Sequence, residues 1–254
     1  MRNKRVGAIA ALLIPSLLAM GVAGAARHHY GRDIRRTDPI AYWRLGQRSG
    51  STADPTVGRY DGTYKGAPKL GRRGLISKNH NRAPHFDGRD DRITVNGLTA
   101  RSKSSWSNGY SLEAWVKTKS TSREGHILAF NSDSGGNGIA LFRDEPSNKF
   151  KFHDCEGSGC ATVYSKTAPV INKIYQVVVA VDGSNRGHLY VNGRSEASFT
   201  SAKRPPHSAR FTIGAEYDCC PKPTSFWRGK IDEVAVYDRA LSSARVAELW
   251  AAGR

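Results

Sequence analysis

Short apolar segments alternate with glycine-containing turns along most of this chain. Glycine follows asparagine or aspartate at residues 61–62, 87–88, 96–97, 108–109 and 192–193, and longer glycine-rich turns occupy 133–138 and 182–187. Such pairs supply the positive φ angles that tight turns require. Between the turns we expect strands at residues 92–95, 110–117, 126–131, 138–143, 149–153, 161–165, 175–182, 188–191, 209–215 and 230–237.

Many short strands separated by turns favour an all-β fold with two antiparallel sheets packed face to face. Helical segments do not alternate with the strands, which argues against a parallel sheet. The clearest hairpin joins residues 175–181 to residues 188–193 through the sequence DGSNRG. The only helix that we expect is short and C-terminal, because Ser242 or Ser243 can cap its N-terminus and Gly253 suits its end.

Residues 1–26 have the pattern of a secretory signal peptide. A basic stretch at 2–5 precedes an uncharged, mostly apolar run, and small residues at 23–25 suit a cleavage site. An uncleaved membrane anchor is the alternative, because the run is about long enough to span a bilayer. We predict cleavage and a secreted protein without a transmembrane segment. A flexible basic leader at 27–37 and one domain at 38–254 would remain.

The chain carries a formal net charge of +17, and its basic residues are spread along the whole sequence. Scattered charge is typical of a solvated surface. The alternative is attraction to an anionic partner, such as an acidic polysaccharide, a cell wall or a phospholipid surface. Nucleic acid is not an expected partner, because no nucleic-acid-binding module is recognisable in this exported chain.

The chain has four cysteines, Cys155, Cys160, Cys219 and Cys220, which indicate disulfide bonds in an exported protein. Zinc binding is the alternative, but a C-x4-C spacing with an adjacent cysteine pair fits no common zinc pattern. A bond between neighbours would strain the intervening peptide, so a 219–220 bond and its complement, 155–160, are disfavoured. The sequence therefore predicts two cross-links that join these two segments, with the individual partners left open.

Several segments carry a resemblance to a known family. They are AYWRLG at 41–46 followed by YDGTYKG at 60–66, FDGRDDRITV at 86–95, YSLEAWVKT at 110–118, LYVNG at 189–193 and GKIDEVAVYDRALSSARVAELWAAG at 229–253. In this order they resemble laminin-G-like jelly-roll domains of the concanavalin A-like lectin and glucanase superfamily. The resemblance implies a two-sheet antiparallel jelly-roll sandwich with one concave sheet. Such a fold hosts many functions, so the site has to be argued separately.

Hydrolysis of glycosidic bonds is the sharpest enzymatic option for this fold. Glucanases on it use carboxylates spaced E-x-D-x-E, because side chains at alternate strand positions share one face and must flank one bond. The chain has no such triplet: Glu113 is followed two residues later by Trp115, and Asp232 and Glu233 are neighbours. We expect the last two carboxylates to be hydrogen-bonded, structural groups, and the protein not to be an enzyme.

The function that we expect is non-catalytic binding of carbohydrate or of an extracellular polymer, with structural or protein-interaction adhesion as the alternative. Sugar recognition needs aromatic faces and a few fixed polar groups. The candidate ligand-binding residues are Trp106, His153, Tyr217 and Trp227, of which the last three lie in or beside two unusual cysteine-containing loops, at 153–161 and 216–225. For both tryptophans the alternative is packing at the edge of the core.

Calcium is the one cofactor that the resemblance suggests. Related jelly rolls hold a structural Ca²⁺ near strand ends through carboxylates and backbone carbonyls. The candidate ligands are Asp61, Asp87 and Asp232, with Asp90 and Asp91 close to the second of them. The alternative is that these are solvated turn carboxylates. An arginine two residues before Asp61 favours this alternative, because it places a positive charge where a cation would need oxygen.

Overall fold

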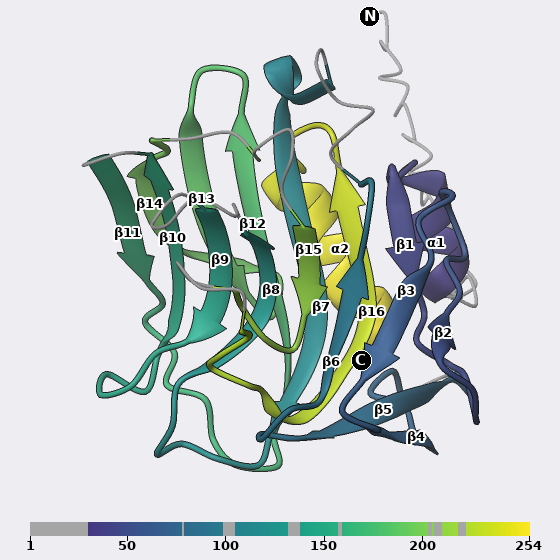
Figure 1. Cartoon of the computed structure of the whole chain (residues 1–254). Helices are drawn as coiled ribbons and strands as arrows, with labels where there is room; N and C mark the ends of the chain where they lie inside the picture. Colours follow the sequence, from purple (N-terminus) through teal and green to yellow (C-terminus); the bar gives the residue numbers. More distant parts are fainter. Residues whose placement is uncertain are drawn as a thin grey trace, which may run out of the picture.

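The computed structural model describes residues 30–77, 79–98, 105–131, 138–156, 159–202, 205, 210–217 and 222–254. The expected signal peptide and the pair Cys219 and Cys220 lie outside these residues. Two antiparallel sheets pack face to face: sheet A, which contains residues 228–237, and sheet B, which contains residues 125–131. Sheet B lies in front of sheet A in Figure 1. The all-β, two-sheet jelly-roll sandwich expected from the sequence is confirmed.

Sheet A carries the strands that pack against both helices. Its order is β14 (Arg194–Thr200), β13 (Arg186–Val191), β12 (Ile174–Asp182), β7 (Gly109–Thr118), β16 (Arg228–Tyr237), β5 (Arg82–Asp87) and β4 (Lys69–Arg73), and β1 (Ala41–Trp43) also pairs with β16. The hairpin of β12 and β13 is the one predicted from the sequence, with Val179 opposite Leu189.

Sheet B faces away from both helices. Its order is β11 (Gly159–Tyr164), β10 (Phe150–Glu156), β9 (Gly138–Arg143), β8 (Gly125–Asn131), β15 (Arg210–Ile213), β6 (Arg92–Val95), β3 (Gly62–Lys65) and β2 (Thr52–Ala53). A single 3-10 turn, η1 (Ser105–Asn108), precedes β7. Because most of these strands lie next to their neighbours in the chain, the sheet is largely built from successive hairpins.

Apolar side chains from the inner faces of both sheets form one core between them. In β7, Leu112 and Val116 belong to this core, whereas Trp115 belongs to a second cluster on the opposite face. This is the alternation that a strand imposes on its side chains. Full burial of a valine or leucine contributes roughly 1.5–3 kcal/mol, so the apposition of the two inner faces holds the sandwich together.

The predicted C-terminal helix is confirmed as α2 (Ser243–Gly253). The side chain of Ser242 accepts a hydrogen bond from the backbone N–H of Arg245, which caps the helix. The helix lies on the outer face of sheet A (Figure 1), where the indole ring of Trp250 stacks on that of Trp115 at 5.1 Å between centroids. This docking supplies the stability that so short a helix lacks in isolation.

A second helix, α1 (Tyr30–Arg36), lies within the segment 27–37 that was expected to be a flexible leader, and it corrects that expectation for the residues of the segment that the structure describes. Tyr30 and Ile34 lie four residues apart and are both buried in the apolar cluster on the outer face of sheet A. Their spacing places them on one side of a helix. The abundance of charge in this segment obscured that pair, although the basic side chains lie on the other side and leave the apolar contact intact.

The disulfide prediction is wrong. Cys155 and Cys160 are bonded to each other, with their Cα atoms 4.1 Å apart. They are directly opposed across the hairpin of β10 and β11, so strand pairing itself brings the two sulfur atoms together. With both thiols used, neither expected cross-link to the 219–220 pair can form. The prediction compared the possible cysteine pairings without knowing that the β10–β11 hairpin places Cys155 opposite Cys160.

Candidate functional site

The outer face of sheet B carries a row of side chains across three strands. Phe142 on β9, Lys151 on β10 and Tyr164 on β11 are register partners. They point away from the core, because alternate residues such as Leu141 and Phe152 fill it. The ammonium nitrogen of Lys151 lies 5.1 Å from the centre of the Phe142 ring and 5.2 Å from that of Tyr164. We call Phe142, Lys151 and Tyr164 the β9–β11 row.

Lys151 is held in place from a second direction. Its ammonium nitrogen lies 3.2 Å from Oδ1 of Asp144, whose other oxygen accepts a hydrogen bond from the hydroxyl of Ser147. At the end of the row, 41% of Tyr164 is exposed. The row therefore combines a positioned cation with an accessible aromatic ring.

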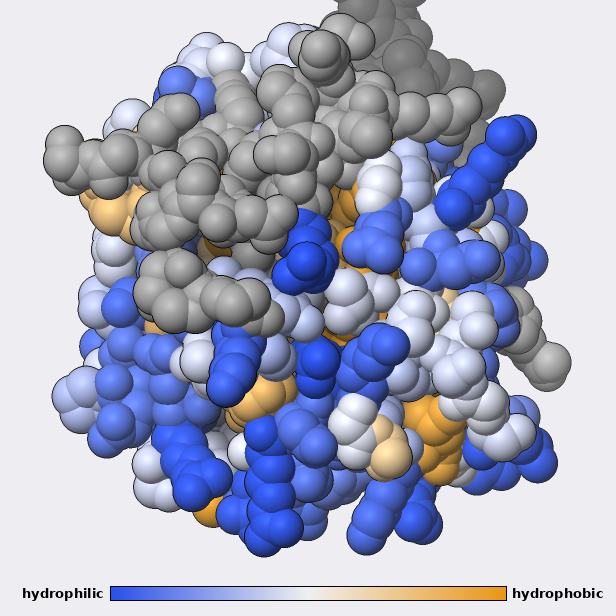
Figure 2. All heavy atoms as spheres, viewed as in Figure 1, coloured by the Kyte–Doolittle hydropathy of each residue, from blue (hydrophilic) through white to orange (hydrophobic). Residues whose placement is uncertain are grey.

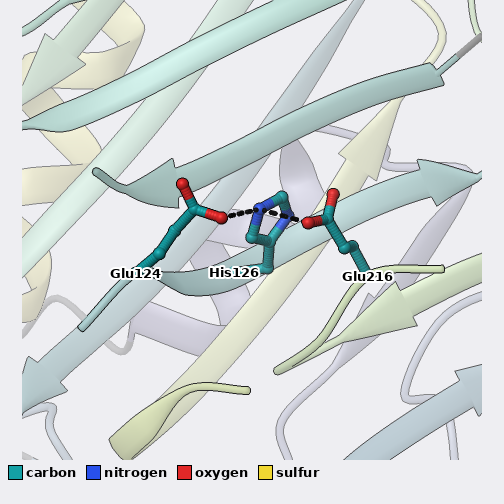
Figure 3. Close-up of side chains that lie close together, drawn as sticks. All are labelled: Glu124, His126 and Glu216. Atoms are coloured by element: carbon teal, nitrogen blue, oxygen red, sulfur yellow. Dashed lines mark ion pairs between the residues drawn. The ribbon is translucent and has the colours of Figure 1, made fainter. Parts of the chain in front are cut away.

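His126 lies beside this row, between two carboxylates. Its Nε2 atom is 3.1 Å from an oxygen of Glu216 and 3.5 Å from an oxygen of Glu124 (Figure 3). The imidazole is only 1% exposed and stacks on the ring of Phe142, 4.4 Å away and nearly parallel. The hydrogen bond with His126 holds the pKa of Glu124 below its ordinary value. This cluster was not predicted from the sequence, although Glu124 directly precedes β8 and His126 is the second residue of that strand.

Two of the predicted ligand-binding residues lie on the same face. The ring of His153 is 5.1 Å from that of Phe142. Tyr217 lies near two guanidinium groups, with that of Arg210 4.4 Å from the ring centre, and its hydroxyl accepts a hydrogen bond from Arg92. Figure 2 shows that the described part of this face is mainly hydrophilic, with isolated apolar side chains. His153 and Tyr217 thus belong to one polar and aromatic surface.

The two predicted tryptophans are not brought to this surface. Trp106 is 3% exposed and packs edge-to-face against Tyr110 and Phe130. Trp227 is 1% exposed, and its indole N–H donates to the backbone carbonyl of Lys230. Both rings belong to the core between the sheets, which is the packing alternative that the sequence left open.

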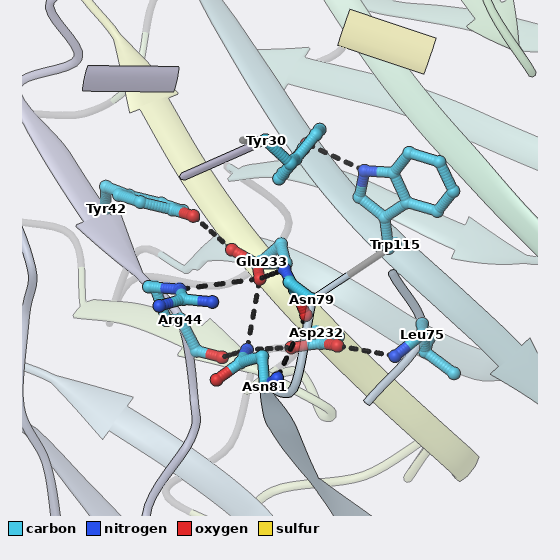
Figure 4. Close-up of polar contacts among 9 residues, drawn as sticks. All are labelled: Tyr30, Tyr42, Arg44, Leu75, Asn79, Asn81, Trp115, Asp232 and Glu233. Atoms are coloured by element: carbon cyan, nitrogen blue, oxygen red, sulfur yellow. Dashed lines mark hydrogen bonds and ion pairs between the residues drawn. The ribbon is translucent and has the colours of Figure 1, made fainter. Parts of the chain in front are cut away.

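A buried polar network occupies the outer face of sheet A, beneath α1 (Figure 4). Asp232 accepts hydrogen bonds from the backbone N–H of Leu75 at 2.7 Å and from the amide of Asn81 at 3.1 Å. Glu233 accepts from the hydroxyl of Tyr42 and from Asn81, and it pairs with the guanidinium of Arg44. Burial raises the pKa of both carboxyls. Both carboxylates are thus buried and hydrogen-bonded, as the sequence predicted.

The predicted calcium ligands are not gathered at one point. Asp87 belongs to a cluster with Asp90 and Asp91 at the β5–β6 turn, and among the described residues neither Asp61 nor Asp232 joins it. Asp91 is 3% exposed, and its Oδ1 atom has no hydrogen-bond partner in the described part of the chain. Burial raises the pKa of this carboxyl to about 6.

A basic row crosses the opposite side of the molecule, on sheet A. Lys69 on β4, His85 on β5, Lys230 on β16 and Lys117 on β7 are successive register partners. Burial, and next the neighbouring Lys117, lowers the pKa of Lys230. None of the three lysines forms an ion pair with any residue that the structure describes. We call these four residues the β4–β7 basic row.

A hollow of about 620 Å³ lies beside α1, and the arginines that line it add to the positive charge on this side of the molecule. Its lining includes Arg32, Arg35, Arg44 and His80, together with the amides of Asn79 and Asn81. A second hollow of about 590 Å³ shares His80 and both asparagines and extends to Arg73 and Arg82. No helix in the described part of the chain is long and apolar enough to cross a membrane.

Residues 87–247 match the model of a family described as the concanavalin A-like lectin/glucanases superfamily, which covers more than half of the chain. No curated protein matches the sequence. Among solved structures, one similar to this chain is domain 4 of AbnA, an extracellular GH43 arabinanase from Geobacillus stearothermophilus, in complex with arabinotriose. Its TM-score is 0.65 at 19% identity, over 83% of this chain and 97% of that domain.

Two larger proteins contain a similar domain. The receptor binding domain of the botulinum neurotoxin C/D mosaic serotype has a TM-score of 0.63 at 13% identity, over 85% of this chain and 51% of that one. Trypanosoma rangeli sialidase has a TM-score of 0.59 at 17% identity, over 84% of this chain and 32% of that one. Identities this low show a shared fold only, because one fold can carry many different functions.

Proposed function

Because this chain belongs to the concanavalin A-like lectin/glucanases superfamily, we propose that it is a secreted, non-catalytic module that binds carbohydrate through the outer face of sheet B. The β9–β11 row carries this proposal: it presents an accessible tyrosine ring beside a lysine held by an aspartate. Sugar sites combine apolar ring faces with a few fixed polar groups. The arabinanase domain with the same fold, whose structure contains arabinotriose, supports this class of ligand.

The carboxylates of the outer face favour binding over hydrolysis. A glycosidase needs one carboxylic acid with a raised pKa to protonate the leaving group. The pKa of Glu124 is instead lowered by its hydrogen bond with His126, and Glu216 contacts the same imidazole nitrogen. Burial raises the pKa of both Asp232 and Glu233, but these carboxyls lie on the other sheet, are closed off from solvent and have their oxygens hydrogen-bonded.

Secretion remains part of this proposal. The Cys155–Cys160 bond is of the kind that persists in oxidising, extracellular surroundings. It ties together the β10–β11 hairpin, which carries Lys151, His153 and Tyr164. A fixed hairpin reduces the conformational freedom that these side chains lose when a ligand binds.

Replacing Tyr164 with alanine is expected to weaken binding to the preferred glycan about tenfold, because an aromatic stacking partner is worth roughly 1–1.5 kcal/mol. The glycan is first identified by an array probed with the mature protein. Titration calorimetry then compares the variant with Val170→Ala, which removes another exposed apolar side chain in the loop after β11. Equal affinities of Tyr164→Ala and wild type would place the sugar elsewhere.

We also propose a structural calcium ion at the cluster of Asp87, Asp90 and Asp91. The buried Oδ1 atom of Asp91 lacks a partner among the described residues, and a hard cation prefers carboxylate oxygens. Repeating the glycan measurement with calcium and with a chelator checks this ion, together with the thermal unfolding midpoint under both conditions. A midpoint that does not change would remove calcium from the proposal.

The β4–β7 basic row favours a second candidate function, adhesion to an acidic polymer. Like charges directly opposite each other on neighbouring strands destabilise a sheet, and a polyanion would remove this repulsion. Strands lie about 4.8 Å apart, so four positions span roughly 14 Å. That spacing suits a chain with repeated carboxylate or sulfate groups.

If this second candidate is correct, replacing Lys117 and Lys230 with glutamine is expected to weaken binding to an acidic polysaccharide about tenfold at low salt. Exposed charges lose most of their attraction beyond a Debye length of about 8 Å at physiological salt, so wild-type binding should also fall steeply as salt is added. Biosensor titrations compare this double variant with Lys65→Gln on β3. Binding that resists salt and tolerates the double substitution would exclude the basic row.

A further inference from the structure

We propose that Glu124, His126 and Glu216 bind one divalent transition-metal ion of the zinc class on the outer face of sheet B. This site goes beyond glycan binding and does not depend on it. The three potential ligand atoms, one from each side chain, all lie within 4.8 Å of one another. They come from two segments far apart in the sequence, the start of β8 and the loop after β15.

The distances suit a small tetrahedral ion. Zinc binds imidazole nitrogen and carboxylate oxygen at about 2.0–2.2 Å, which separates neighbouring ligand atoms by roughly 3.3 Å. The two distances from Nε2 of His126 to the carboxylate oxygens, 3.1 and 3.5 Å, lie on either side of this value. Figure 3 shows both carboxylates directed at the same ring nitrogen. An ion would fit with small side-chain rotations.

A proton satisfies this arrangement poorly. Nε2 can carry one hydrogen, whereas two carboxylates converge on it. An imidazolium would leave the cluster with a net negative charge, which Lys151 reduces only from a distance. The Nδ1 atom of His126 is buried and has no hydrogen-bond partner in the described part of the chain. The two carboxylates favour the tautomer with its proton on Nε2, so a metal ion that binds this nitrogen takes the place of that proton, and the neutral ring then carries its hydrogen on Nδ1.

The side chains of His126 and Glu124 and the backbone of Glu216 are held in place before any ion binds. The stack on Phe142 fixes the plane of the His126 ring. Glu124 accepts a hydrogen bond from the hydroxyl of Ser225 at 2.9 Å. The backbone of Glu216 exchanges two hydrogen bonds with that of Thr224. Preorganised ligands of this kind lose little conformational entropy on binding.

The ligand set indicates the class of metal. Imidazole suits zinc and its first-row neighbours, whereas calcium takes oxygen ligands almost exclusively. Three protein ligands leave a fourth tetrahedral position open. Glu124 is 35% exposed at its side chain, so solvent reaches the cluster from the side of this residue.

The test uses the mature protein after treatment with a chelator that is then removed. Wild type is expected to bind one equivalent of Zn²⁺ in competition with a chromogenic chelator, and Co²⁺ should give the visible absorption of a tetrahedral N/O site. Glu124→Gln and Glu216→Gln keep the side-chain shape and should each weaken zinc affinity at least tenfold. Glu248→Gln, an exposed change on α2, should bind like wild type.

Two further measurements make the result decisive. The adjacent histidines His28 and His29 are a competing site that could capture the metal. Zinc binding should therefore be measured after both are replaced by alanine, and it should be unchanged if the metal lies at His126. Histidine-selective NMR should show zinc shifting the Nε2 resonance of His126 in wild type, which does not depend on any variant folding. The site is overturned by the absence of stoichiometric binding, by unchanged affinity in both glutamine variants, or by loss of binding with the histidine pair.

Discussion

Replacing Glu113 with alanine is expected to lower the free energy of unfolding by about 3–5 kcal/mol. The carboxylate is fully buried on the outer face of sheet A and accepts three hydrogen bonds. The hydroxyls of Tyr30 and Tyr237 donate at 2.7 and 3.0 Å, and the amide of Gln176 donates at 2.7 Å. Alanine would leave three buried donors without this acceptor and would remove the hydrogen bond between α1 and β7. Urea unfolding followed by fluorescence measures the loss.

Glutamine at position 113 is the matched control, since it keeps the volume and one acceptor oxygen. Burial raises the pKa of Glu113 above its ordinary value of 4.5, so the folded state binds this proton more tightly than the unfolded state. The corresponding contribution to stability is fully present below pH 4.5 and is lost as the pH rises through the raised pKa. Glutamine does not titrate. The stability deficit of Glu113→Gln relative to wild type should therefore shrink as the pH rises above 4.5 and through the raised pKa.

Either of two results would contradict this account of Glu113. An alanine variant within about 1 kcal/mol of wild type would mean that the three donors find other partners. A glutamine deficit that grows with pH would mean that the folded state favours the ionised carboxylate.

Replacing Gly229 with alanine is expected to lower the free energy of unfolding by about 4 kcal/mol or more. This residue has φ +138°, and a Cβ atom there would lie 2.1 Å from the backbone carbonyl oxygen of Lys117. Strained backbone and overpacking each cost on the order of 1–3 kcal/mol. Gly229 pairs with Thr118 on β7 and with Phe86 on β5, so neither neighbour can move without breaking the sheet.

The variant Gly97→Ala separates the cost of strained backbone from the cost of overpacking. Gly97 also has a positive φ, +77°, but no atom of a described residue lies within 4 Å of the position that a Cβ would take there. Gly97→Ala should lower the free energy of unfolding by only about 1 kcal/mol, because it adds backbone strain alone. Chemical denaturation of both variants gives the comparison. If Gly229→Ala costs no more than Gly97→Ala, the close contact between β16 and β7 is wrong.

The candidate site was only partly readable from the sequence. His153 and Tyr217 were placed near a ligand because of the unusual loops around them, and both lie on the outer face of sheet B. Trp106 and Trp227 were chosen for the same aromatic chemistry, yet both are in the core. Residue type indicates that a side chain is large and aromatic. The side of the sheet to which it points depends on the register of the strand and on what covers it.

The sequence by itself determined the features that depend on neighbours in the chain. Glycine-containing turns and alternating apolar segments are local patterns, and they predicted the antiparallel strands. The spacing in α2 and its serine cap are equally local. Local backbone preferences and side-chain periodicity decide such elements before any long-range contact forms.

Only the tertiary structure decided which distant groups meet. Tyr30 reaches Glu113 across 83 positions in the chain, which converts a charged segment into a docked helix. Strand pairing opposes Cys155 to Cys160 and so replaces the expected cross-links. The return of the chain after β15 brings Glu216 to His126 and completes the proposed metal site. Each of these contacts depends on sheet order and register, which are set by the packing of the whole core rather than by any single segment.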